Sequence, residues 1–146
     1  MPTDKKALLF NGISLIAILY LLTTGPLFIQ NLPFLFMQIF GILLIFWALL
    51  ASKVNKHRHE DKLPKGTFLI TKGPYEIIRH PIYAGLLLIM AGFAQGYITI
   101  PRFIAFAVIL FFVLMKIIYD ESILDEHVKE YEEYKKKTHR LIPYFF

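Results

Sequence analysis

The sequence contains no cysteine. Disulfide bonds, thiolate nucleophiles and cysteine-ligated metals are therefore excluded for this chain, and so is lipidation on a cysteine of its own. Charge is also scarce, because 18% of the 146 residues are charged and 56% are hydrophobic, whereas soluble domains average roughly 25% and 45–50%. Residues 7–52 and residues 81–101 contain no charged side chain at all. We therefore predict one membrane domain over residues 1–146.

The two charge-free stretches are long enough for several membrane spans, since about 20 apolar residues cross a bilayer as a helix. They predict spans at residues 7–24, 33–52, 81–100 and 102–119. No A-x-A-like cleavage site follows the first segment, so we expect a retained span and not a signal peptide. The predicted fold class is all-α, an integral membrane helical bundle of about four transmembrane helices, with a loop at residues 53–80 and a tail at residues 120–146.

Prolines mark the predicted boundaries. Gly25-Pro26 ends the first helix, and Pro33, Pro81 and Pro101 suit first helical turns, where the missing N–H of proline leaves nothing unpaired. Between the second and third spans, residues 67–71 form a short apolar run that we expect to pack against the membrane face.

The positions of the basic residues predict the orientation. Lysines and arginines occur before the first span, in the loop of residues 53–80 and in the tail, whereas the connection at residues 25–33 has none. By the positive-inside rule the N-terminus, this loop and the C-terminus are cytoplasmic, with Arg102 as the exception. The net charge of +5 then reflects membrane topology, so we expect no nucleic-acid partner.

The last helix is predicted to continue beyond the membrane. After Asp120 the apolar residues keep one helical face, and they are Ile123, Leu124, Val128, Tyr131 and Tyr134. A helix from Arg102 to Lys137 is roughly 54 Å long at 1.5 Å per residue, so its last third forms a cytosolic extension that walls a pocket. The alternative is an amphipathic helix lying among the lipid headgroups.

The stretch Arg79-His80-Pro81-Ile82-Tyr83-Ala84-Gly85 stands where the basic loop enters a hydrophobic segment. Taken singly, its residues are explained by topology, by interfacial aromatic anchoring and by helix packing. Together they suit a zwitterionic ligand with an adenine ring. His80 and Tyr83 share a helix face, Gly85 lets a flat group approach, and Arg79 and the helix N-terminus favour a carboxylate.

An acidic pair, Asp120-Glu121, follows the fourth predicted span. Either acid can bind a ligand amine or sulfonium, or simply mark the end of the span. Asp120 is four residues after Lys116 and is expected to pair with it. We favour Glu121 as the ligand-binding acid, because it starts a second recognisable run of residues.

That run consists of an acid, a leucine, two tyrosines and a basic residue before Ile-Pro, namely Glu121, Leu124, Tyr131, Tyr134, Thr138, Arg140, Ile142 and Pro143. With RHPxYxG and the preceding Gly73-Pro74-Tyr75, it resembles the integral membrane methyltransferases that include isoprenylcysteine carboxyl methyltransferase and the phospholipid N-methyltransferases. The resemblance covers residues 73–143. Two departures are Asp120, where the family commonly has Glu, and Val128-Lys129, where Phe-Gly is frequent.

The resemblance implies S-adenosylmethionine as cofactor and methyl transfer to a lipid or other lipophilic acceptor at the membrane. It implies cofactor binding by His80, Tyr83, Gly85 and Glu121, with Arg79 and Glu121 as the catalytic candidates, and it adds Tyr131 and Arg140 as weaker site candidates. An isoprenylcysteine-type carboxylate, a phospholipid amine and a small lipophilic molecule all fit as acceptors. A carboxylate needs no base, whereas an amine must lose a proton, which His80, Tyr83 or Glu121 can accept.

Two other functions stay open on the sequence. One is a membrane reductase of related fold that uses NADPH, and the other is a non-enzymatic anchoring or assembly protein whose basic loop contacts anionic lipid. The cluster at residues 57–61 contains two histidines and two acids, but a basic interfacial loop explains it better than a metal site. We therefore predict no metal, and the sequence leaves the acceptor and the oligomeric state undecided.

Overall fold

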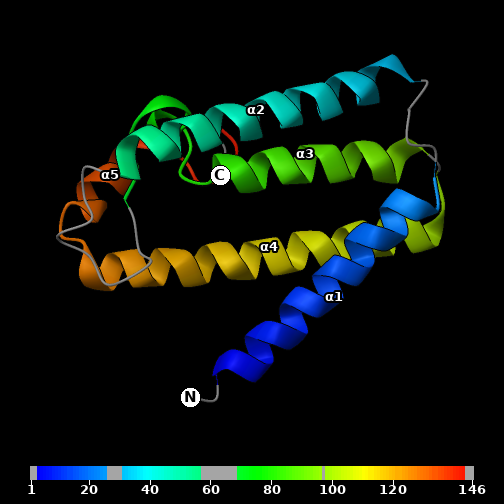
Figure 1. Cartoon of the computed structure of the whole chain (residues 1–146), viewed down its shortest axis with the longest axis horizontal. Helices are drawn as coiled ribbons and strands as arrows, with labels where there is room; N and C mark the ends of the chain where they lie inside the picture. Colours follow the sequence, from blue (N-terminus) through cyan, green and yellow to red (C-terminus); the bar gives the residue numbers. More distant parts are fainter. Residues whose placement is uncertain (1–2, 26–30, 57–68, 97, 144–146) are drawn as a thin grey trace. The chain divides into compact units, whose positions relative to one another are not determined.

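The computed structural model describes residues 3–25, 31–56, 69–96 and 98–143, and every regular element in these ranges is a helix (Figure 1). In chain order they are α1 (Thr3–Thr23), α2 (Leu32–Lys56), the short 3-10 helix η1 (Gly73–Glu76), α3 (Pro81–Gly96), α4 (Ile100–His127) and α5 (Tyr131–Lys137). Strand-like pairing within the described residues is limited to one isolated parallel bridge, Ile78 with His139. The predicted all-α class is confirmed.

Two of the helices are long and apolar enough to cross a membrane, over Leu32–Lys53 of α2 and Ile100–His127 of α4. Only 17% and 22% of their most apolar windows are buried, whereas the core helix of a soluble protein is mostly buried. Helix α3 is shorter than the predicted third span, because it ends at Gly96 and its 16 residues reach about 24 Å against a hydrocarbon core of about 30 Å. The structure thus supports two candidate spans, and the total of four stays a prediction.

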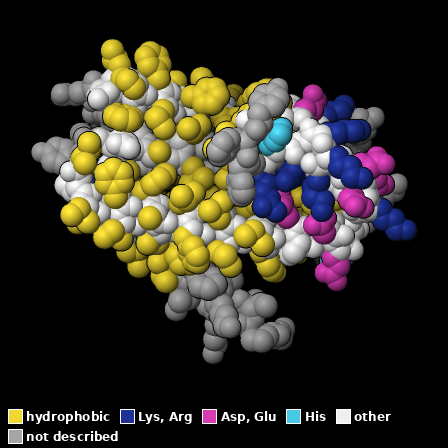
Figure 2. All heavy atoms as spheres, turned by 180° about the vertical axis from the view of Figure 1, so that it is seen from behind, with side chains coloured by type: hydrophobic (Ala, Val, Ile, Leu, Met, Phe, Trp, Pro, Cys, Tyr) yellow, Lys and Arg dark blue, Asp and Glu magenta, His cyan; other side chains and the backbone are white. Residues whose placement is uncertain are grey.

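Large apolar side chains are exposed along α2 and α4, as expected where the surrounding medium is lipid. Those on α2 include Phe36, Ile39, Phe40, Leu43, Phe46 and Trp47, and those on α4 include Ile104, Phe111, Met115, Ile118 and Tyr119. Figure 2 shows hydrophobic side chains spread over much of one face, with the acidic and basic side chains gathered on one part of it.

The chain forms two compact units, and each is built from two separate stretches of sequence. Unit 1 comprises Met1–Phe40 and Leu87–Met115, and unit 2 comprises Gly41–Leu86 and Lys116–Phe146. Among the residues whose side chains the structure describes, Arg102 is the one charged residue of unit 1, and all the others belong to unit 2. The polar chemistry predicted from the sequence therefore lies in unit 2.

Arg102, the exception to the charge pattern, is buried inside unit 1 with 2% of its surface exposed. Its guanidinium donates to Thr24 Oγ1 at 2.6 Å and to the backbone carbonyls of Leu21 at 3.2 Å and Phe93 at 2.6 Å. These carbonyls belong to the last turns of α1 and α3, where helical carbonyls lack partners and the helix dipole is negative. Arg102 therefore caps two helix ends. A side chain at Gly25 would clash with Arg102, since an added Cβ lies 2.5 Å from the Arg102 guanidinium.

Arg102→Leu leaves those carbonyls unpaired. We expect the free energy of unfolding to fall by about 2–4 kcal/mol, measured by thermal unfolding in detergent. Arg102→Lys keeps the charge and should lose less. An unchanged melting temperature for the leucine variant would contradict the capping role.

The prediction of a continuous helix from Arg102 to Lys137 was wrong. The helix leaves the predicted span as expected but ends at His127, and a turn leads to α5. The Val128 N–H still donates to the Leu124 carbonyl at 2.9 Å, and the Tyr131 N–H then donates to the Val128 carbonyl at 3.1 Å. Val128 and Tyr131 are both buried. No proline or glycine causes this break, so tertiary packing overrides the local helical pattern.

Two glycines of unit 2 are required by close approach. Gly73 has φ +68°, a left-handed conformation that side chains rarely adopt, and it lies against Ala51 and Trp47. Gly85 is buried, and an added Cβ would lie 2.6 Å from the Gly41 carbonyl oxygen and 2.6 Å from the Ile45 side chain. Gly85 therefore lets the first turns of α3 pack directly on α2.

Gly85→Ala forces backbone apart, because the clashing atom is a carbonyl oxygen and not the tip of a flexible side chain. Such overpacking costs about 1–3 kcal/mol, and we expect a lower melting temperature in detergent. Gly12→Ala is the matched control, since an added Cβ there meets nothing within 4 Å. Equal melting temperatures for the two variants would refute the packing role of Gly85.

Candidate functional site

The site begins where the tail pairs with the segment that precedes α3. The Arg79 N–H donates to the His139 carbonyl at 2.7 Å, the His80 N–H donates to the Arg140 carbonyl at 3.1 Å, and the His139 N–H donates to the Ile77 carbonyl at 3.0 Å. This short parallel pairing fixes the backbone at Arg79 and His80. Pro81 then starts α3, because proline is compatible with the first helical turn.

The Arg79 side chain holds α5 in place. Its Nη1 donates to the carbonyls of Thr138 at 2.5 Å and Lys135 at 3.3 Å, at the C-terminal end of α5. A cation is favourable there, since the last carbonyls of a helix carry partial negative charge. Tyr134 adds a second link, because its hydroxyl donates to the Tyr75 carbonyl at 2.6 Å. The tail is thus attached to the site through both its backbone and its side chains.

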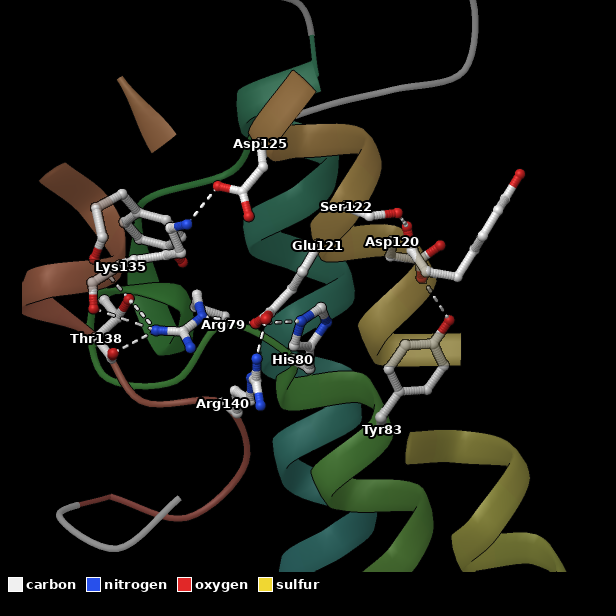
Figure 3. Close-up of polar contacts among 12 residues, drawn as sticks. Arg79, His80, Tyr83, Asp120, Glu121, Ser122, Asp125, Lys135, Thr138 and Arg140 are labelled. Atoms are coloured by element: carbon white, nitrogen blue, oxygen red, sulfur yellow. Dashed lines mark hydrogen bonds and ion pairs between the residues drawn. The ribbon is translucent and has the colours of Figure 1, made fainter. Parts of the chain in front are cut away.

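Glu121 joins these pieces to α4. Its Oε1 accepts from Arg79 Nε at 2.8 Å and from His80 Nε2 at 3.3 Å, and its Oε2 accepts from Arg140 Nε at 2.9 Å. Since an ionised carboxylate only accepts, His80 carries its hydrogen on Nε2. Figure 3 shows the three side chains converging on this one carboxylate. The side chain of Glu121 is only 6% exposed, so the interactions lie largely out of water.

Glu121 lies beyond the predicted span, and its surroundings keep it ionised. Burial alone raises the pKa of a carboxyl group, but the hydrogen bonds from His80 and Arg79 and the charges of Arg79 and Arg140 lower it to about 2. Both carboxylate oxygens are committed to these protein cations. Glu121 therefore links the segment before α3 and the tail to α4, and its predicted role in cofactor binding stays a prediction.

Asp120 belongs to a different cluster. Tyr83 Oη donates to Asp120 Oδ2 at 3.2 Å, and Lys116 Nζ donates to Asp120 Oδ1 at 2.5 Å. Figure 3 shows Asp120 directed toward Tyr83 and away from Glu121. The predicted pairing of Lys116 with Asp120 is confirmed. His80 and Tyr83 also share a face as predicted, since their rings stack with centroids 5.8 Å apart.

A cavity of about 390 Å³ opens between the two clusters within unit 2. Its polar lining among the described residues comes from Tyr75, Arg79, His80, Lys116, Asp120, Tyr131 and Tyr134, and its apolar lining comes from Leu69, Ile70, Ile123 and Leu124. The volume lies in the range of small-molecule sites, roughly 300–1,000 Å³, and a few convergent polar groups on an apolar wall are typical of such sites.

Tyr131 lines this cavity and carries an unsatisfied polar atom. The residue is 1% exposed, and among the described residues its hydroxyl has no hydrogen-bond partner. Burial raises the pKa of Tyr131, as do the negative charges of Glu121 and Asp125, so the hydroxyl stays protonated. Burial likewise raises the pKa of Tyr75 and Tyr134. A buried hydroxyl without a partner is costly, which suits a site completed by a ligand or water.

The structure thus brings most of the predicted site residues together, but their contacts differ from those expected on the sequence. Arg79, His80 and Tyr131 line the cavity. Glu121 and Arg140 form an ion pair with each other. Tyr83 contacts Asp120, and Gly85 packs on α2. Asp120, ranked below Glu121 on the sequence, is the acid in the described lining of the cavity, and its place in the acidic pair was the signal for it. The cluster of residues 57–61 lies outside the described residues.

Apolar helices long enough to cross a membrane, together with a polar cavity of small-molecule size, are the features of a helical membrane-type protein. The sequence profile of the phospholipid methyltransferase family matches residues 29–131. This is more than half of the chain, and the chain belongs to that family. The match ends at Tyr131, so the roles of Thr138 and Arg140 rest on the geometry alone.

Two similar proteins are also described as methyltransferases. Two rice proteins, from Oryza sativa subsp. indica and subsp. japonica, are each described as a probable protein-S-isoprenylcysteine O-methyltransferase. Each is 36% identical to this chain over 78 residues, which covers 52% of this chain and 41% of the relative. The aligned part thus spans less than half the length of these relatives. No solved structure matches the chain.

Glu121→Gln removes a largely buried charge and leaves two arginines without their shared partner. We expect about 3 kcal/mol less stability at pH 7, seen as a lower melting temperature in detergent. The pKa of Glu121 is lowered from 4.5 to about 2 on folding, so its contribution is complete above about pH 4.5 and is lost as the pH falls toward 2. The difference from wild type should be constant from pH 7 to 5 and should shrink below about pH 4.5.

Glu126→Gln is the control for this variant, because Glu126 is exposed on the same helix. It should melt like the wild type at every pH. If Glu121→Gln also melts like the wild type at pH 7, the carboxylate does not hold the site together.

Proposed function

We propose that this protein transfers a methyl group from S-adenosylmethionine to a lipophilic acceptor at the membrane surface, in the cavity between α4, η1 and the tail. Family membership supports methyl transfer as the reaction class. The observation that carries the proposal is the cavity itself, which combines a carboxylate, cationic groups, aromatic rings and the unpaired Tyr131 hydroxyl.

The cavity residues fit S-adenosylmethionine group by group. Its positively charged centres suit Asp120, whose carboxylate is 29% exposed. Its carboxylate suits the positive charge of Arg79 on the wall. The rings of Tyr75, Tyr131 and Tyr134 suit an adenine, and the Tyr131 hydroxyl offers a donor or an acceptor that the described residues leave unused.

When bound, S-adenosylmethionine supplies a methyl group on a sulfonium, so the acceptor forms a bond to the methyl carbon while the carbon–sulfur bond breaks and its electron pair stays on sulfur. The chain's own residues hold both reactants in near-attack geometry, which is the largest contribution needed for such a displacement. Asp120 positions the cation, and Arg79 and Tyr131 orient the rest of the donor. Glu121 is a positioning residue that acts through Arg79 and His80.

The acceptor decides whether a base is needed. A carboxylate oxygen gains the methyl group without releasing a proton. A protonated amine must give up one proton before its nitrogen can attack, and His80 lines the cavity as a group that can take it.

The proposed setting is a multi-pass membrane protein with the cavity on the cytoplasmic side. Its spans would be those predicted at residues 7–24, 33–52, 81–100 and 102–119, of which α2 and α4 supply helices of sufficient length. The basic residues of the loop and tail favour cytoplasmic termini. Arg102 no longer opposes this orientation, because its charge is buried against two helix ends.

S-adenosylmethionine binding is the direct test, measured by isothermal titration calorimetry on purified protein in detergent with NADPH as comparator. We expect micromolar affinity for wild type, at least tenfold weaker binding for Asp120→Asn because the counter-charge is lost, and a smaller loss for Tyr131→Phe. Glu126→Gln should bind like wild type. Folded protein that binds neither compound would overturn the proposal, and binding of NADPH alone would establish the reductase instead.

A further inference from the structure

Lys116 differs from the other basic groups of the cavity. Its side chain is 49% exposed, whereas those of Arg79 and His80 are each 10% exposed. Its Nζ lies 2.5 Å from Asp120 Oδ1 and 5.4 Å from the centroid of the Tyr119 ring. An exposed ion pair of this kind is worth only about 0–1 kcal/mol, so a ligand can replace either partner at little cost.

The position of Lys116 is where a lipophilic molecule would arrive. Ile118 and Tyr119, on the same part of α4, are exposed apolar side chains, while Lys116 itself lines the polar cavity together with Ile123 and Leu124. Lys116 lies three residues before the end of the predicted span of residues 102–119, where a lysine side chain can reach the membrane interface. A head group of an amphiphile lying along this surface would meet the ammonium first.

The two acids next to the cavity pair differently. Glu121 is shared between Arg79 and Arg140, whereas Asp120 pairs with Lys116. When a cationic donor pairs with Asp120, Lys116 loses its partner and its charge becomes available. Binding of the first ligand thereby creates an anion site beside the first ligand's cation. A purely cationic acceptor would be repelled at the same place.

We propose that Lys116 is a specificity-determining residue that binds an anionic oxygen group, a carboxylate or a phosphate, on the methyl acceptor. The inference rests on the proposed function, since it needs the donor cation at Asp120. It places the acceptor's anionic group next to the reacting methyl. Binding is therefore ordered, and the two ligands help each other.

The test uses Lys116→Gln, Lys116→Arg and the control Lys136→Gln, which changes an exposed lysine of α5 that is not part of the described cavity lining. Two acceptor probes separate the two anion sources. One is a prenylated cysteine with a free carboxylate, compared with its carboxamide, and the other is phosphatidylethanolamine in detergent micelles, compared with diacylglycerol.

Probe binding is measured by calorimetry without turnover, in the presence of one of two analogues. Sinefungin has an amine in place of the sulfonium, and S-adenosylhomocysteine has an uncharged thioether sulfur at that place. For wild type we expect one anionic probe to bind, about tenfold more tightly with sinefungin than with S-adenosylhomocysteine, a typical coupling between two sites. Its neutral counterpart should bind weakly. Lys116→Gln should abolish both differences while keeping the affinity for sinefungin, and Lys116→Arg and Lys136→Gln should behave like wild type.

The inference fails if Lys116→Gln binds the anionic probe as wild type does, or if neither anionic probe binds wild type in the presence of sinefungin. Either result leaves the proposed function standing, provided that wild type binds S-adenosylmethionine. If wild type does not bind S-adenosylmethionine at all, the proposed function fails first and the inference fails with it.

Discussion

The structure of unit 2 depends on one buried carboxylate. Glu121 accepts hydrogen bonds from Arg79, His80 and Arg140, which come from the segment before α3 and from the tail. Without it, two arginines at this place would repel each other, and Arg140 of the tail would lose its partner on α4. Because Glu121 satisfies its neighbours, the cavity beside it can present Asp120, Lys116 and Tyr131 to a ligand. Of two adjacent acids, Glu121 is thus paired with arginines and Asp120 lines the cavity.

Much of the fold was predictable from local patterns. Charge-free stretches bounded by proline predicted the helices. In lipid the backbone N–H and C=O groups must hydrogen-bond to each other, and a helix makes all these bonds within one segment. The break between α4 and α5 was not predictable, since the sequence there has helical periodicity and no proline or glycine. It arises because Tyr131 becomes buried and Arg79 caps α5, and both causes involve residues distant in sequence. The early end of α3 was missed because apolar content continues beyond Gly96.

The candidate site was predictable as a set of residues but not as a set of roles. The order of RHPxYxG and the acidic pair indicated which side chains meet, and the structure brings Arg79, His80 and Glu121 together. Which of two adjacent acids faces the cavity depends on a helix rotation of about 100° per residue and on the partners available. The sequence favoured Glu121 because it starts the second run of residues, and that signal does not indicate the direction of the side chain. Gly85 suggested ligand access, yet its space is taken by the Gly41 carbonyl and Ile45. Arg102 looked like a topology exception and turned out to be a helix cap.

The hydrogen bond between Arg79 and Thr138 joins residues 59 positions apart, which has a consequence for biogenesis. At a synthesis rate of about 5–20 residues per second, the tail follows Arg79 by roughly 3–12 s. During that interval Arg79 has no tail to hold. The helices α3 and α4 are thus made before the tail tyrosines Tyr131 and Tyr134, which complete the described lining of the cavity. A partly made chain therefore has its long apolar helices before it has this cavity.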